Sequence, residues 1–526
     1  MKGEKEMELI RNHLHQLNRK SEAVSQITFD EDYNVPDARP DVGRMIQKKG
    51  EVTVNEVQVN EGRAQISGAL GFSLLYVSDG EEKKVCSLEG QLPIDEGLNL
   101  DGLSSGDKIC LKWEIEDLSI HLVNSRKLNV KAVVTFQASV EELSDIELPM
   151  GLKDEEGISV RKKNIRALEL GVQKKDTLRI KKEVTIASNK PDIHGILWKD
   201  LEIRGLDLRA EEDKVTVKGE LFLFVLYSGT DEDNPLQWLE QAIPFTGAVE
   251  CAGCTSDMVP IIETTMIQNA MEIAPDADGE ERVLQLDVVL ELDLKLYQET
   301  ACELLLDVYT PQKQAIPVSE PRTLESLLVK NFSKCRVSDR LQVEGVQNKV
   351  LQICHGEGSI KVDEKKIVEN GIQVEGVVEL RILYIITDDE MPFYSVESAI
   401  PFTHVVEAPG ITADCRYYLR TDLEQLSTTM IDSNEIEVRA VINLNAVVFS
   451  GREEEIISEI REEELDMEKL QNMPGIVCYL VQPGDTLWDI AKRFYTTTEE
   501  IQKLNGLKSE TLQPLDSLLL VKKVEP

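Results

Sequence analysis

Apolar and polar residues alternate along most of this chain with a period of two, which is the spacing of side chains on one face of a β-strand. The clearest run covers residues 436–449, in which every second residue from 436 to 446 is apolar. These apolar residues are Ile436, Val438, Ala440, Ile442, Leu444 and Ala446. Turn signals such as Ser78-Asp79-Gly80 and Asn370-Gly371 separate the predicted strands. The pattern predicts antiparallel, sandwich-like domains of about seven to nine strands each.

One of the predicted strands occurs three times, at residues 66–76, 217–227 and 374–384. In each copy a glycine precedes a tyrosine by eight residues, and a proline follows the tyrosine by 17. The repeated residues are Gly68, Tyr76 and Pro93, then Gly219, Tyr227 and Pro244, then Gly376, Tyr384 and Pro401. Periods of 151 and 157 residues predict three tandem domains rather than a solenoid. We interpret the repeated glycines and tyrosines as structural, because a strand glycine marks a bulge or a close backbone approach.

The three domains are expected at residues 21–142, 165–300 and 323–451, with connectors between them. Segment 1–20 and the acidic segment 452–475 are expected to be helical, because apolar residues are interleaved with charged ones. In the second segment Ile456, Ile457, Ile460 and Leu465 would form one apolar stripe. That stripe docks on the third domain or presents a partner-binding face, or else the segment is a loose tether.

Residues 476–526 follow a different pattern. A short strand at Tyr479 leads to a Pro483-Gly484 turn and a helix with apolar residues at 487, 490, 491 and 494. A second short helix stops at Asn505-Gly506, and a last strand covers residues 518–521. The pattern predicts a β-α-α-β unit of about fifty residues. We expect Trp488, on the first helix, to be substantially buried within it.

The formal net charge is −38, and almost all of it lies before residue 476. Such a field repels nucleic acid and anionic lipid, so neither is expected as a direct ligand. It suits a basic protein partner or simply keeps the chain soluble. No run of about 18 apolar residues predicts a transmembrane segment, and no signal-peptide pattern is present. Nine scattered cysteines are typical of a reducing compartment rather than of a disulfide framework.

Candidate chemical motifs are few. Cys251-Ala-Gly-Cys254 is a lone pair without the further ligands that a zinc site needs. Gly102-Leu-Ser104-Ser-Gly106 has the spacing of a hydrolase elbow, but polar residues surround it where an apolar strand and a helix are required. The chain has no phosphate-binding loop motif, and its six histidines form no metal-binding pair. We predict no catalytic residue, no metal and no cofactor.

The C-terminal unit resembles a LysM module in its Gly484–Trp488 and Leu504–Leu507 strings. That resemblance implies a groove for polymers of N-acetylglucosamine. Carried over to this chain, the groove residues are Gly484, Asp485, Thr486, Leu487, Asn505, Gly506, Leu507 and Leu515. Leu515 stands where the family commonly has glycine, so we expect the turn there to differ, because leucine does not readily take positive φ. We favour a protein over a glycan as the ligand of this groove.

The three copies resemble the SPOCS domain of spore-forming Firmicutes in the repeated strand and in Arg39-Pro40-Asp41-Val42, which matches residues 190–193. The third copy departs there, with Asn348-Lys349-Val350. Three such domains before a LysM module resemble the clostridial spore-coat morphogenetic proteins. This resemblance implies a noncatalytic scaffold in the mother-cell cytoplasm that recruits the coat's basement-layer ATPase and other coat proteins to the forespore surface. The alternative function is that of a glycan-binding protein acting through the LysM module.

Overall fold

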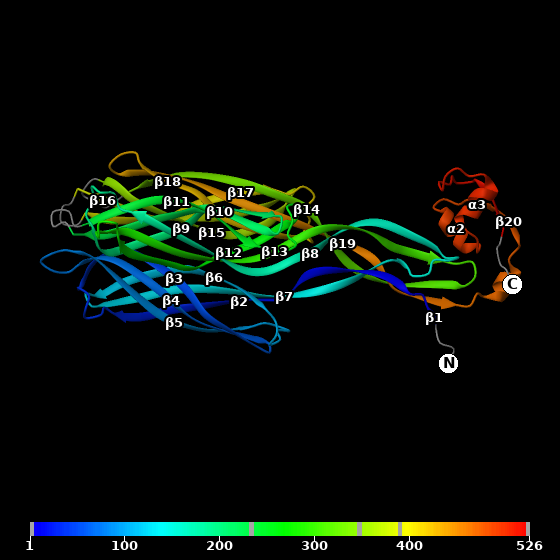
Figure 1. Cartoon of the computed structure of the whole chain (residues 1–526), viewed down its shortest axis with the longest axis horizontal. Helices are drawn as coiled ribbons and strands as arrows, with labels where there is room; N and C mark the ends of the chain where they lie inside the picture. Colours follow the sequence, from blue (N-terminus) through cyan, green and yellow to red (C-terminus); the bar gives the residue numbers. More distant parts are fainter. Residues whose placement is uncertain (1–4, 231–235, 344–349, 388–391, 522–526) are drawn as a thin grey trace.

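The computed structural model describes residues 5–230, 236–343, 350–387 and 392–521. Three β-repeats lie at one end of an elongated molecule, and a small α/β domain lies at the other end (Figure 1). Each repeat contains two antiparallel sheets of three strands, which we call its long sheet and its short sheet. The sheets are held face to face by alternating apolar side chains, as the sequence pattern predicts.

Every repeat uses the same order of six strands. Repeat 1 has the long sheet β2 (Leu9–Asn34), β7 (Lys127–Leu152), β6 (Ile109–Asn124) and the short sheet β3 (Val42–Asn60), β4 (Arg63–Ser78), β5 (Val85–Asn99). Repeat 2 has β8 (Ser159–Thr185), β13 (Glu281–Tyr309), β12 (Val259–Pro275) and β9 (Ile193–Glu211), β10 (Lys214–Gly229), β11 (Leu236–Glu250). Repeat 3 has β14 (Gln314–Gln342), β19 (Glu435–Glu463), β18 (Arg416–Met430) and β15 (Val350–Val368), β16 (Gly371–Ile386), β17 (Phe393–Glu407). The short β1 (Lys5–Glu6) pairs with the end of β19.

The number of strands differs from the seven to nine that we expected. The described strands of the repeats are 15 to 29 residues long, apart from β1, so six of them account for each repeat. Long strands arise because the alternating pattern continues without a break through segments that we expected to be connectors, as in β7 and β8. The fold class is as predicted: three antiparallel β-sandwich-like domains followed by a small β-α-α-β unit.

The repeated residues occupy equivalent places. Each glycine-to-tyrosine segment is the central strand of a short sheet, and Tyr76, Tyr227 and Tyr384 are buried at the end of that strand. The hydroxyl of Tyr76 donates a hydrogen bond to the carbonyl of Pro40 (2.9 Å), and Tyr227 reaches the matching Pro191 carbonyl (3.5 Å). In repeats 1 and 2 the tyrosine hydroxyl therefore ties its strand to the segment that enters the short sheet.

The glycines and prolines of the repeat fit the backbone around them. Gly68 and Gly376 lie opposite β-bulges, where an added Cβ would come closer than 3.0 Å to a carbonyl oxygen of the neighbouring strand. Gly219 also lies at a register shift, and the ring of Phe245 covers it. The prolines stand in β5, β11 and β17, which are edge strands, so the missing N–H breaks no central ladder.

The long sheets continue beyond the short sheets and form what we call the stalk, which leads to the C-terminal domain (Figure 1). Its core takes side chains from six strands, two strands in each of the three repeats. Among these residues are Leu14, Leu148, Ile165, Leu304, Leu324 and Ile456. The repeats therefore share the stalk core, in addition to the separate core inside each repeat.

Two expected helices are absent from the stalk. Segment 1–20 was expected to be helical, but from Leu9 it is strand β2, paired with β7. The first half of the acidic segment 452–475 is the end of β19, paired with β14, and in the second half α1 (Met467–Asn472) is helical. Ile456, Ile457 and Ile460 are buried in the stalk core, so they form no partner-binding stripe. Pairing with strands far away in the sequence decides both segments, because local propensity is weak.

The C-terminal domain has the predicted order: β20 (Ile476–Leu480), α2 (Leu487–Arg493), α3 (Thr498–Asn505) and β21 (Ser517–Val521). Thr486 and Thr497 cap the two helices, each accepting a backbone hydrogen bond with its side chain. Gly506 ends α3 in the left-handed conformation, with φ 63°. The core lies between the helices and the inner face of the two-stranded sheet.

Candidate functional site

The first candidate site lies where the short sheets of the three repeats meet. Lys49, Asp200 and Glu357 each pair with the residue three positions before the repeated tyrosine of their own repeat. They are therefore structurally equivalent, although their charges differ. Lys49 forms ion pairs with Asp200 and with Glu357 (3.3 Å), so it bridges all three repeats. We call this group, with its neighbours Glu202, Arg204 and His355, the axial cluster.

The remaining members of the axial cluster complete its charge balance. Arg204 binds Glu202 through two nitrogens, at 2.8 and 2.9 Å. The His355 ring lies 3.2 Å from Asp200 and 2.8 Å from Glu240, through its two nitrogens. The same ring stacks on Phe224, with 4.1 Å between the ring centroids. Side chains from repeats 1, 2 and 3 thus form one closed network.

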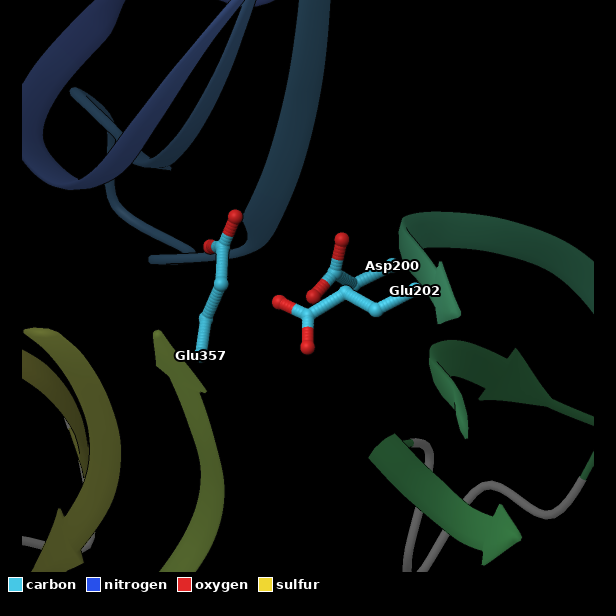
Figure 2. A group of neighbouring side chains, drawn as sticks. All are labelled: Asp200, Glu202 and Glu357. Carbon is cyan, nitrogen blue, oxygen red and sulfur yellow. The ribbon is translucent and has the colours of Figure 1, made fainter. Parts of the chain in front are cut away.

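The axial cluster contains three carboxylates that are close enough together to be considered as metal ligands. Figure 2 shows Asp200, Glu202 and Glu357 converging from two repeats, and their oxygens lie within 4.8 Å of one another. Three carboxylates can hold a hard cation in principle. Here Lys49 already binds two of them and Arg204 binds the third, so protein cations supply the counter-charge. The arrangement is that of a buried ion-pair network, and we propose no metal there.

Burial and charge shift the pKa values of this cluster in different directions. Burial, reinforced by the nearby Asp200 charge, raises the pKa of Glu202 to about 7. Burial would lower the pKa of His355, but its hydrogen bonds to Asp200 and Glu240 outweigh that effect and raise the pKa to about 9. Burial likewise opposes ionisation of Asp200, yet His355 and Lys49 hold its pKa below the ordinary value. His355 is therefore charged at neutral pH and contributes a cation to the cluster.

The second candidate site is the groove predicted on the C-terminal domain. Its polar side chains are engaged within the domain. Asp485 accepts hydrogen bonds from Tyr479 and from the Gln482 N–H, and Thr486 caps α2. Asn505 bonds the Leu519 N–H and C=O, at 2.7 and 2.8 Å, and so fastens α3 to β21. These contacts leave the groove few side-chain groups for a sugar.

The other groove residues are glycines and leucines. Gly484 and Gly506 have φ values of 94° and 63°, which fit the two loops. Leu487 is buried and Leu507 half-buried, whereas Leu515 is 73% exposed. Leu515 takes φ 76°, so the expectation that this turn would avoid positive φ is wrong. The backbone keeps the conformation that glycine would adopt, at a strain cost of about 1–2 kcal/mol.

The domain is fixed to the tip of the stalk through α2. The Trp488 indole N–H donates to Asp307 (2.8 Å), and Lys492 forms an ion pair with the same carboxylate (2.7 Å). The ring of Tyr309 meets that of Trp488 edge-on, with 4.7 Å between centroids, and belongs to the domain's hydrophobic core. Trp488 is thus half-buried and faces the stalk, rather than filling the domain core alone.

The motifs set aside in the sequence are structural. Cys251 and Cys254 are buried in the turn after β11, and burial with the neighbouring thiol raises the pKa of Cys254 to about 11. A thiol in that state is a poor nucleophile and a poor ligand. Ser104 lies in a turn, where its N–H donates a hydrogen bond to the Asp107 carboxylate, and this turn is not the strand-to-helix elbow of a hydrolase.

Fold and sites together describe a protein of repeated β-domains that carries one terminal binding module. Comparison with protein families matches the SipL, SPOCS domain at residues 41–123, 192–273 and 349–431, and the LysM domain at residues 479–520. The chain is therefore made of three SipL SPOCS domains and a C-terminal LysM domain. These are binding domains without catalytic function.

The SipL family suggests a role in spore coat assembly, and the LysM domain suggests peptidoglycan binding. Neither the curated proteins nor the solved structures contain a match to the chain. Among the described residues, no helix has the length and hydropathy needed to cross a membrane.

Proposed function

We propose that this protein is a noncatalytic scaffold of the spore coat. It acts in the mother-cell cytoplasm, at the forespore surface, and recruits the morphogenetic ATPase of the coat basement layer and other coat proteins. The observation that carries the proposal is the combination of three SPOCS domains with one LysM domain in a single chain. The shared stalk core and the axial cluster join the three repeats, and the LysM domain lies at the end of the stalk.

Two features of the LysM domain support a protein as its partner. The polar side chains of the groove are engaged in hydrogen bonds within the domain, as described for Asp485, Thr486 and Asn505. Leu515, one of the groove residues, is exposed and takes positive φ, and it adds apolar surface to the groove, which suits a protein partner better than a sugar hydroxyl.

The test is co-purification from sporulating cells with the full chain and with a chain that ends at residue 475. We expect the ATPase to co-purify with the full chain and to be lost, or strongly reduced, without residues 476–526. Equal recovery of the ATPase with both chains would exclude recruitment through the LysM domain.

Glycan binding is the second candidate function, and the LysM match at residues 479–520 favours it. Titration of the full chain with N-acetylglucosamine oligomers separates the two. Tight binding of the oligomers together with no measurable affinity for the ATPase would replace the first proposal with the second.

A further inference from the structure

A polar pocket of about 1000 Å³ lies between the tip of the stalk and the LysM domain. The stalk supplies residues 157–162 and the turn at Pro311–Gln312. The LysM domain supplies residues 486–488, 497–499 and 510–511. Residues 486–487 also belong to the predicted groove, so this pocket adjoins the groove and adds a wall from the second repeat to it.

The pocket runs along the edge of strand β8. In a strand, successive side chains point to opposite faces, so a pocket on one face would include every second residue. Here the four consecutive residues Ser159, Val160, Arg161 and Lys162 all line it. Within the described part of the chain, β8 pairs only with β13 and forms the outer strand of its sheet. Alternate N–H and C=O groups of an outer strand point away from its partner and are free to pair with another chain.

The opposite wall of the pocket suits a polar chain rather than an apolar side chain. It carries Thr486, Thr497, Thr498 and Thr511, of which Thr486 and Thr497 use their hydroxyls to cap α2 and α3. Charges of both signs lie at the rim, with Arg161 and Lys162 on the stalk and Glu499 and Glu510 on the LysM domain. The free edge is four residues long, which corresponds to about 13 Å of extended chain.

We propose that this pocket, which we call the edge pocket, binds an extended polar segment of a protein partner, which adds to β8 as a further strand. Main-chain hydrogen bonds to β8 supply the affinity, and the polar lining of the pocket favours a polar segment over an apolar one. The proposal rests on the proposed function, because it names how a coat protein is held by the LysM end of this scaffold.

Asp307 positions the LysM wall of the edge pocket. It lies opposite Arg161 in the β8–β13 ladder and holds both Trp488 and Lys492 of α2. The contact includes this carboxylate, the Tyr309–Trp488 ring pair and the packing of Tyr309 into the LysM core, so the two walls are joined beside the pocket. The site is therefore complete only in the full chain.

The test uses the full chain and overlapping synthetic peptides that tile the coat ATPase. Binding is measured by fluorescence anisotropy, and hydrogen exchange reports on backbone amides. We expect at least one peptide to bind and to slow exchange at residues 159–162, because a paired strand protects those amides. Replacing Thr511 with tryptophan fills the pocket and is expected to weaken that peptide's binding about tenfold or more. Ser509→Trp, in the same exposed loop but outside the pocket lining, is the matched control and should bind normally.

Three outcomes contradict the proposal in distinguishable ways. If the intact ATPase binds the full chain but no peptide protects residues 159–162, the edge pocket is wrong and the proposed function stands. If N-acetylglucosamine pentamer protects these amides and the peptides do not, the pocket takes a glycan. If the ATPase and all its peptides fail to bind, the proposed function fails together with the edge pocket.

Discussion

Replacing Lys49 with methionine tests whether the axial cluster holds the three repeats together. Lys49 is the cation that Asp200 and Glu357 share, and the Asp200 side chain is only 1% exposed. Removing one partner of a buried ion pair costs about 3–5 kcal/mol, since it leaves a charge without compensation. Asp200 keeps His355 and Glu357 keeps Arg381, and the Lys49 side chain is 32% exposed, so we expect a loss near 3 kcal/mol.

The assay is urea unfolding of the full chain, followed by fluorescence. Trp198 is a suitable reporter, because it is buried in the core cluster that residues of all three repeats form around the axis. Lys48→Met is the matched control. Lys48 is the adjacent residue and forms a 3.5 Å ion pair with Glu397, whose side chain is 50% exposed whereas that of Asp200 is buried, so the loss of this pair should cost less than about 1 kcal/mol.

The refuting result is a Lys49→Met chain that unfolds at the same urea concentration as Lys48→Met. In that case the bridge across the repeats would contribute no more than a surface pair, and the repeats would be held by apolar packing alone. A second transition appearing only in Lys49→Met would instead indicate that one repeat separates from the others, which supports the bridging role.

Three further outcomes are expected. The pKa of His355 is raised from 6.5 to about 9, so protonation of His355 stabilises the fold fully below pH 6.5, and about 3 kcal/mol of that stability is lost as the pH rises through 9. The urea midpoint of the full chain should therefore fall over this pH range, and His355→Gln should make the midpoint depend much less on pH. Gly68→Ala should destabilise the fold by about 2 kcal/mol or more, because the added Cβ would collide with the Thr53 carbonyl oxygen. Gly71→Ala, whose Cβ would make an ordinary contact, should change the melting temperature little, and equal melting temperatures for the two variants would contradict the close approach at Gly68. Leu515→Gly should relieve backbone strain and stabilise the LysM domain by about 0.5–1 kcal/mol, seen as slower local hydrogen exchange; faster exchange would argue against strain at this turn.

Local patterns predict those parts of the fold whose partners are close in sequence. The LysM unit is compact in sequence, so its turn, caps and helix spacing are enough to predict β20 to β21. The stalk is different, because the paired residues of β2 and β7 are 93 to 143 positions apart in the sequence and those of β14 and β19 are 93 to 149 apart. Segments 1–20 and 452–463 carry many charges because one face of each strand meets water, and charged residues interleaved with apolar ones also fit an amphipathic helix.

The axial cluster could not be predicted from single residues. Lys49, Asp200 and Glu357 look like ordinary surface charges on alternating strands. Aligning the three copies on the repeated tyrosine places them at one position, but their proximity also requires that the short sheets meet at a common axis. That meeting depends on apolar residues such as Leu75, Phe224 and Leu383.

An aspartate–arginine ion pair that occurs in the first two repeats can be recognised by comparing the three copies in the sequence. Asp41 binds Arg126 (3.0 Å), and in the second copy Asp192 binds Arg282 (2.7 Å). The backbone oxygens of Arg126 and Arg282 accept equivalent hydrogen bonds, and Asn434 takes that place in the third copy. The third copy also has lysine at position 349, which lies outside the described residues, where the others have aspartate. Acid and arginine are thus replaced together, which is what a paired contact requires.

The differing charges at one equivalent position have a consequence for assembly. Three separate, identical chains packed in this way would place three lysines, or three aspartates, against one another at the axis, and like charges there would repel. Covalent linkage of the copies lets each position around the axis carry its own residue, so Lys49 can meet Asp200 and Glu357. Tandem fusion thus gives the architecture of a homotrimer without its sequence identity. It also fixes the stoichiometry at one LysM domain for every three β-domains.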